Sequence, residues 1–377
     1  MANFAFTDEQ EELRRTIRRF MDEKSPSGEV RRLMATEGGY DDVVWKQMGH
    51  ELGLQGIAVA ESHGGQGIGP VELGIVLEEM GKSLFGGPFF GSISVAEPAI
   101  AFASTEEQRV ELLPGIASGD TIAALALAES SGRWDADGIT MVAAPSGDGF
   151  LLSGTKSYVL DGHNASLIAV AARLPGTSGS DGIGVFVVDG QSDGLTRTLL
   201  DTIDQTRKQA RLDFDNVRAR PLGTPGEAWP ALSKALDVAA IFLAAEMTGG
   251  AQRCLDMAVE YAKNRVQFGR PIGSFQAIKH KCADMLLRVE SAKAASYYAL
   301  WIAAEDTDEL PVVASLAKAY CSDAYFFCAT ENIQVHGGMG FTWEHDAHLY
   351  FRRAKSSELL FGDAPYHREL LAQRLGI

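Results

Sequence analysis

The spacing of apolar and polar residues changes twice along the chain. Residues 7–119 have helical spacing: Leu13 and Ile17 lie on one face, behind Thr7 and Gln10, which have the spacing of a capping box. Further helices are predicted at about 40–52 and 71–80. We therefore expect an N-terminal α-helical domain at 1–120.

A glycine-rich loop at 64–69 follows the apolar residues 57–60 and precedes the helix predicted at 71–80. A strand, such a loop and a helix in this order are typical of dinucleotide-binding folds. Pro70 stands where the third glycine of that motif is needed, so the spacing does not fit. We interpret the loop as a tight connection between helices, outside any cofactor site.

The next hundred residues have the pattern of strands. Short β-like runs divided by Gly, Pro, Asp and Ser lie at 121–128, 140–144, 149–160, 167–173, 183–188, 195–201 and 209–214. Several short strands in succession predict a small β-barrel or sandwich. This central β domain is expected at 121–222.

Long helical patterns return after residue 222. They cover about 229–268, 274–304, 310–336 and the residues from 344 onward, with short joints between them. Long helices with short joints predict a C-terminal four-helix bundle at 223–377. The fold class is therefore α+β, with helices, then strands, then helices.

Composition narrows the function classes. The net charge of −16 argues against a general nucleic-acid surface, so a site for an anionic ligand needs local Arg and Lys. The four cysteines lack metal-ligand or disulfide spacing and are expected to be core residues in a reducing compartment. Without a signal-peptide pattern or a bilayer-length apolar run, the chain is expected to be cytoplasmic, with no membrane or metal partner.

The stretch 261–280 reads as a helix end, a tight turn and a second helix. Tyr261, Arg265 and Phe268 fall at i, i+4 and i+7, so one helical face is expected to carry all three. Ser274 is expected to cap the following helix. An arginine and an aromatic with Gln276 beyond the turn suit the pyrophosphate and adenine of a large cofactor. The alternative is a capped helix hairpin with an exposed arginine.

A second stretch, at 334–346, contains Gln334, Gly337, Gly338 and Gly340 with the spacing Gln-x-x-Gly-Gly-x-Gly. Together with Arg-x-x-Phe-Gly and Phe-Gln in the first stretch, it closely resembles the acyl-CoA dehydrogenase family. Members are FAD flavoproteins that oxidise the Cα–Cβ bond of acyl-CoA thioesters in lipid degradation. The resemblance covers essentially the whole chain and implies the same α, β and bundle arrangement.

In this family each FAD lies between two subunits, and the resemblance implies which residues here would contact it. Those at the pyrophosphate and ribityl end would be Arg265, Phe268, Phe275 and Gln276, and those at the adenine and pyrophosphate would be Gln334, Gly337 and Gly338. Arginine is a bidentate phosphate donor and glycine allows close backbone approach, so both sets fit physically. His336 is either a further FAD contact or a packed helix-end residue.

The half of the site that faces the flavin ring departs from the family. The hydroxyl expected near the ring is replaced by Ala128, and the serine expected near the CoA thioester arm is replaced by Trp134. Tyr158 and Leu160 stand where the family has a tryptophan and a threonine beside the ring. Tyr158 is a weak ring-side candidate; the alternative is an aromatic in the barrel core.

The catalytic base is a larger departure. Phe361 stands at the glutamate position of most members, and Ala239 and Ala240 stand where a second branch has its glutamate and arginine. Glu246, in a small and apolar stretch, is the candidate base, because a desolvated carboxylate suits that role. The alternative is a glutamate bonded to a partner helix. Asp363, two residues beyond Phe361, is the other candidate base; the alternative, which we favour, is that it caps a turn.

Three hypotheses follow from the resemblance. The chain is a self-sufficient acyl-CoA dehydrogenase that uses Glu246, or the base-lacking subunit of a heteromeric, possibly steroid-type, acyl-CoA dehydrogenase. The third is a flavin oxidase or monooxygenase on the same fold. The implied partners are an acyl-CoA substrate, an electron-transfer flavoprotein as acceptor, and a second subunit in a homo-oligomer or heteromer.

Overall fold

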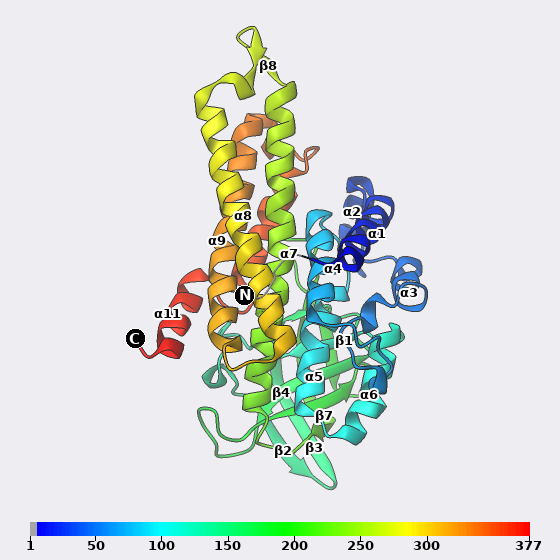
Figure 1. Cartoon of the computed structure of the whole chain (residues 1–377). Coiled ribbons are helices and arrows are strands. Elements are labelled where there is room, and N and C mark those ends of the chain that lie inside the picture. The colour runs from blue at the N-terminus through cyan, green and yellow to red at the C-terminus, as the bar shows by residue number, and fades with distance from the viewer. Residues whose placement is uncertain (1–5) are drawn as a thin grey trace. The chain divides into compact units, whose positions relative to one another are not determined.

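The computed structural model describes residues 6–377. The N-terminal helices (Figure 1) are α1 (Asp8–Lys24), α2 (Ser27–Met34), α3 (Asp42–His50), α4 (Pro70–Lys82), α5 (Glu97–Ala103) and α6 (Glu106–Ser118), with a π-helix at Phe90–Ala96. The capping box at Thr7 is confirmed, since the side chains of Thr7 and Gln10 bond reciprocally to each other's backbone N–H. Residues 64–69 form an irregular connection before α4, as predicted.

The strands form one closed sheet. They are β1 (Ala123–Ala126), β2 (Val142–Ser146), β3 (Gly149–Leu160), β4 (Leu167–Arg173), β5 (Ile183–Asp189), β6 (Leu195–Leu199) and β7 (Gln209–Leu222). The pairings run β4–β5–β7–β3–β2 and return to β4 through Val142 and Arg173, so the sheet is a small barrel. β7 is longer than predicted, because its pairing with β3 and β5 continues beyond Phe214.

The C-terminal region consists of α7 (Trp229–Asn264), α8 (Gln276–Glu305), α9 (Leu310–His336), α10 (Ala347–Leu359) and α11 (Ala364–Leu375). A two-stranded hairpin, β8 (Val266–Gln267) with β9 (Arg270–Pro271), joins α7 to α8. Small residues allow close helix packing: a Cβ added to Gly250 of α7 would lie 2.4 Å from the Tyr325 ring of α9.

Two predictions at this joint are wrong. Helix α7 ends at Asn264, and Phe268 lies in the hairpin turn with φ +53, so it does not share a helical face with Tyr261 and Arg265. Phe268 and Gly269 both have positive φ, as a tight hairpin turn requires. Ser274 does not cap α8: the N-cap position is Phe275, which makes no capping bond.

The chain folds as two compact units. One comprises residues 1–32, 70–85 and 240–377, and the other comprises residues 33–69 and 86–239. The boundaries at 120 and 222 stay predictions, while the helix, barrel and helix order of the fold class is confirmed. Among residues 6–377, no helix combines the length and apolar character needed to cross a bilayer, and no cluster of metal-ligating side chains is found.

Candidate functional site

The α7–α8 joint presents an arginine and an aromatic to solvent. Arg265 follows the last residue of α7, and its carbonyl accepts a hydrogen bond from the Ile272 N–H at 2.8 Å, which closes the hairpin base. The Phe268 side chain at the tip is 91% exposed. Its ring meets Phe275 edge-on with 6.0 Å between centroids, and Phe275 lies under the Arg270 guanidinium. The exposed ring leaves apolar surface in water, which suits contact with a ligand or a second chain.

The end of α9 supplies the second predicted set. Gln334 is exposed, and Gly337 ends the helix with φ +62 and ψ −144, a conformation open to almost no residue but glycine. A Cβ at Gly337 or Gly338 would meet no atom within 4 Å, so the backbone of this turn is uncovered. Glycine is therefore needed at 337 for the backbone conformation, and the uncovered turn leaves room for a ligand.

His336 connects the two sets. Its imidazole is buried and stacks on Tyr261 of α7 with 4.3 Å between centroids, and Nδ1 lies 2.8 Å from the Asn332 carbonyl. Burial lowers the pKa of His336, so the ring stays neutral at neutral pH. The packed interpretation of His336 is confirmed, and this stack places the end of α7 beside the turn at Gly337.

These residues fit the ADP portion of FAD. They offer an exposed guanidinium for a phosphate, an exposed amide, aromatic rings and an uncovered glycine backbone around one helix junction. Arg265 would hold the pyrophosphate, and Gln334 with the Gly337–Gly338 backbone would hold the adenine and the adjacent phosphate. The pairing of these roles with the residues stays a prediction.

The ring-side candidates lie on the barrel. Ala128 and Leu160 are buried, whereas Tyr158 is 45% exposed and has φ +59 in an irregular stretch of the β3–β7 pairing. The barrel-core interpretation of Tyr158 is therefore wrong. Leu160 presents no hydrogen-bonding group, and a buried alanine methyl replaces the hydroxyl expected at position 128. Only Tyr158 offers a surface to a planar ligand.

A buried ion pair supports this stretch. Lys156 Nζ donates to Glu129 at 2.8 Å and to the Leu127 carbonyl at 2.9 Å, and Glu129 also accepts from Thr140 and from the Met141 N–H. Burial lowers the pKa of Lys156 to about 8, against the opposing effect of Glu129. The pair joins the segment that follows β1 to β3, two residues before Tyr158.

The first base position is occupied by a clamped phenylalanine. Phe361 is buried and has φ +63 in the turn between α10 and α11. The fully buried Lys318 donates to the carbonyls of Glu358 and Gly362 at 3.0 and 2.9 Å, and His367 Nε2 lies 3.1 Å from the Phe361 carbonyl. Lys318 and His367 therefore fix the backbone of this turn, but the Phe361 side chain that the turn carries has no ionisable group.

The other base candidates are also accounted for. Ala239 and Ala240 are buried in α7. Glu246 is 5% exposed and accepts from Arg353 Nη1 of α10 at 2.6 Å. This is the contact expected of a glutamate bonded to a partner helix, and the role of Glu246 as a base stays a prediction. Asp363 caps α11 by accepting from the Tyr366 N–H, as predicted.

Two residues of this region were missed from the sequence. Neither Arg353 nor Lys318 was singled out as a predicted site residue. A signal existed for Lys318: it is a lysine inside the apolar helical run of α9, where a charged side chain needs several partners. No signal in the local sequence pairs Arg353 with Glu246.

The comparisons with known proteins cover the whole chain. Family models described as the N-terminal, middle and C-terminal domains of acyl-CoA dehydrogenase match residues 7–120, 124–217 and 226–376. The acyl-CoA dehydrogenase IpdE2 of Mycobacterium tuberculosis is 34% identical over 94% of this chain and 93% of its own length.

Two solved structures have the same fold. Butyryl-CoA dehydrogenase of Megasphaera elsdenii superposes with a TM-score of 0.92 and 27% identity over 100% of both chains. A chain of the ChsE4–ChsE5 complex of Mycobacterium tuberculosis superposes with a TM-score of 0.88 and 27% identity over 100% of this chain and 99% of that one. Members of the family are FAD-dependent oxidoreductases. On these grounds, the chain belongs to the acyl-CoA dehydrogenase family.

Proposed function

We propose that this chain is the base-lacking subunit of a heteromeric acyl-CoA dehydrogenase and supplies the half of the FAD site that binds the ADP portion. A second chain of the family would supply the carboxylate that removes the Cα proton and the groups beside the flavin ring. The observation that best supports this proposal concerns the positions of the base. Phe361, Ala239 and Ala240 are buried and apolar, and Glu246 is paired with Arg353.

The roles in this chain follow from its own side chains. When bound, FAD accepts hydride from Cβ of the acyl-CoA. The Arg265 guanidinium would neutralise the pyrophosphate, and the uncovered Gly337–Gly338 backbone would allow N–H groups to reach it. Without a carboxylate at 361 or 239, this chain has no group at those positions to take the α proton. An electron-transfer flavoprotein is the proposed acceptor.

The similarity to the ChsE4–ChsE5 complex supports a heteromer, because that structure pairs two differently named chains. The second candidate is a self-sufficient dehydrogenase that uses Glu246. It is favoured by the burial of Glu246 in a mostly apolar stretch of α7, where a carboxylate is desolvated.

The deciding experiment is the FAD content of the chain purified alone and after co-expression with a second family member, followed by bleaching of the flavin band with acyl-CoAs. We expect little FAD alone and full FAD in the complex. The Arg265→Ala complex is expected to lose FAD, while Arg15→Ala, which removes an exposed arginine from α1, is expected to keep it. A chain that holds FAD alone and is reduced by an acyl-CoA would contradict the proposal, and so would normal FAD content in the Arg265→Ala complex.

A further inference from the structure

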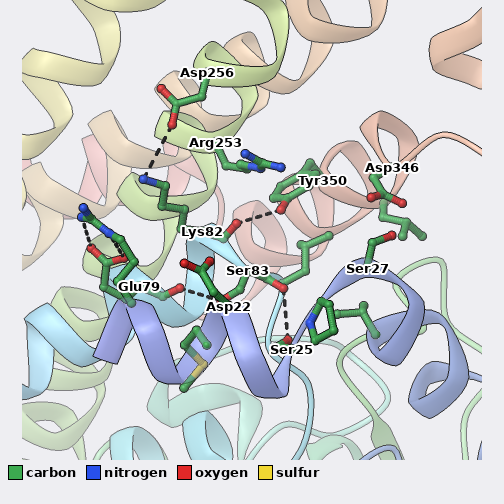
Figure 2. Close-up of a pocket in the computed structure, with 16 residues that line it drawn as sticks. Asp22, Ser25, Ser27, Glu79, Lys82, Ser83, Arg253, Asp256, Asp346 and Tyr350 are labelled. Atoms are coloured by element: carbon green, nitrogen blue, oxygen red, sulfur yellow. Dashed lines mark hydrogen bonds and ion pairs between the residues drawn. The ribbon is translucent and has the colours of Figure 1, made fainter. Parts of the chain in front are cut away.

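A cavity lies within the unit that carries α1, α4 and the C-terminal helices. Its volume is about 440 Å³, which is within the range of small-molecule sites. Its walls come from α1, α2, α4, α7 and α10 (Figure 2). Its lining contains none of the residues predicted to bind FAD or to act as the base. Whatever it binds is therefore additional to the flavin.

Part of the buried cavity wall is apolar. Met21, Leu84 and Leu349 are 1%, 3% and 4% exposed and line the cavity, together with the ring of Tyr350. Leu84 has φ +52, an unfavourable conformation for a leucine that is tolerated where the surroundings fix it, often at ligand sites. This wall suits an apolar ligand body.

Most charges around the cavity are already paired. Arg18 holds Glu79 through two hydrogen bonds of 3.0 and 2.8 Å. Arg31 holds Asp346 at 2.8 Å. Asp256 accepts from Gln252 at 2.7 Å and lies 3.7 Å from the Lys82 ammonium. These pairs neutralise one another and leave little attraction for a ligand.

Arg253 of α7 is one of two exceptions, with Asp22 of α1. Its guanidinium lies beside the Tyr350 hydroxyl, which itself donates to the Lys82 carbonyl at 2.7 Å. Burial raises the pKa of Tyr350, so the hydroxyl stays protonated and only orients the arginine. Among residues 6–377, Arg253 has no carboxylate partner. Arg253 is exposed to solvent, and no neighbouring carboxylate of the described residues neutralises its charge; Figure 2 shows its side chain near Tyr350.

Two further features limit the ligand. Ser27 begins α2 at the cavity, so the first N–H groups of that helix add partial positive charge. Asp22 of α1 also lines the cavity and, in the described part of the chain, has no cationic partner. Its carboxylate disfavours a second negative charge on the ligand, so a monoanion fits better than phosphate.

We propose that this cavity binds a small monocarboxylic acid with an apolar body. The carboxylate pairs with Arg253 near the start of α2, and the apolar body lies on Met21, Leu84 and Leu349. Asp22 selects against dianions. The site goes beyond the proposed function, because it requires neither FAD nor a catalytic base.

The test is calorimetric titration of the full chain, alone or in its complex, with hexanoate, 1-hexanol and inorganic phosphate. We expect hexanoate to bind, and phosphate and 1-hexanol to bind at least about tenfold more weakly. Arg253→Gln is expected to weaken hexanoate binding at least about tenfold, and Asp22→Asn to strengthen it. Arg15→Gln on α1 is the matched control and is expected to change nothing.

Three results would contradict the proposal: no hexanoate binding, equal binding of 1-hexanol and hexanoate, or unchanged hexanoate binding by the Arg253→Gln variant. FAD content in the Arg253→Gln complex separates this result from the main proposal. Since Arg253 is not an FAD residue, FAD is expected to stay. Conversely, Arg265→Ala is expected to leave hexanoate binding unchanged. Thermal unfolding of both variants checks that they fold.

Discussion

Replacing Glu246 tests whether its main role is structural. The Glu246 and Arg353 side chains are 6% and 2% exposed, and Oε1 lies 2.6 Å from Nη1. Removing one partner of a buried ion pair leaves the other charge without compensation, which costs about 3–5 kcal/mol. Arg353 also donates to the Phe85 carbonyl at 3.4 Å. We expect Glu246→Gln to cost about 3 kcal/mol, because the amide oxygen still accepts a hydrogen bond from Arg353.

The double variant Glu246→Leu with Arg353→Met separates pairing from packing. It removes both charges together, so it is expected to be less destabilised than the sum of the single variants by about 2 kcal/mol or more. Glu12→Gln is the matched control: Glu12 pairs with Arg15 on α1 with both side chains about two-thirds exposed, and it is expected to cost less than about 1 kcal/mol.

The assay is urea unfolding followed by circular dichroism and by tryptophan fluorescence. The loss is expected in the transition of the unit that contains residues 240–377. Unfolding of Glu246→Gln within about 0.5 kcal/mol of the wild type would refute the structural argument. If the isolated chain also turns over an acyl-CoA and Glu246→Gln stops turnover without loss of stability, Glu246 is the base.

Three further predictions concern single residues. Gly337→Ala puts a Cβ into φ +62, so it is expected to cost about 1–3 kcal/mol and to lower FAD retention, measured by denaturation and by flavin absorbance of the complex. Phe268→Ser is expected to change stability by less than about 0.5 kcal/mol, because the ring is 91% exposed, but to lower FAD retention; unchanged retention would remove Phe268 from the site. Burial raises the pKa of Glu97 to about 7, so the folded state favours the neutral acid, and the resulting stability, present below about pH 4.5, is lost as the pH rises through 7. The free energy of unfolding of Glu97→Gln is therefore expected to exceed that of the wild type at pH 8, by at most about 3 kcal/mol. At pH 5 the two free energies of unfolding are expected to differ less.

Local patterns along the chain determined the elements and their order. The helical pattern located α9 at its observed bounds, and short β-like runs divided by Gly, Pro, Asp and Ser located β3 and β4 at theirs. The motifs around Arg265 and Gly337 each lie within a short segment, and their residue types suit binding of the ADP portion of FAD, so the sequence alone could indicate them. The capping box at Thr7 depends on residues three positions apart, so it was readable from the sequence.

Tertiary structure decided what depends on distant partners. Glu246 and Arg353 are 107 residues apart in the chain, and nothing near either residue specifies their pairing. The course of Phe268 was misjudged because hairpin pairing of β8 with β9 outweighed the helical period. The cavity around Arg253 needs five helices to converge. The periodicity of a segment determines its local conformation. The partner that neutralises a buried charge comes from a remote part of the chain, so only the tertiary structure decides it.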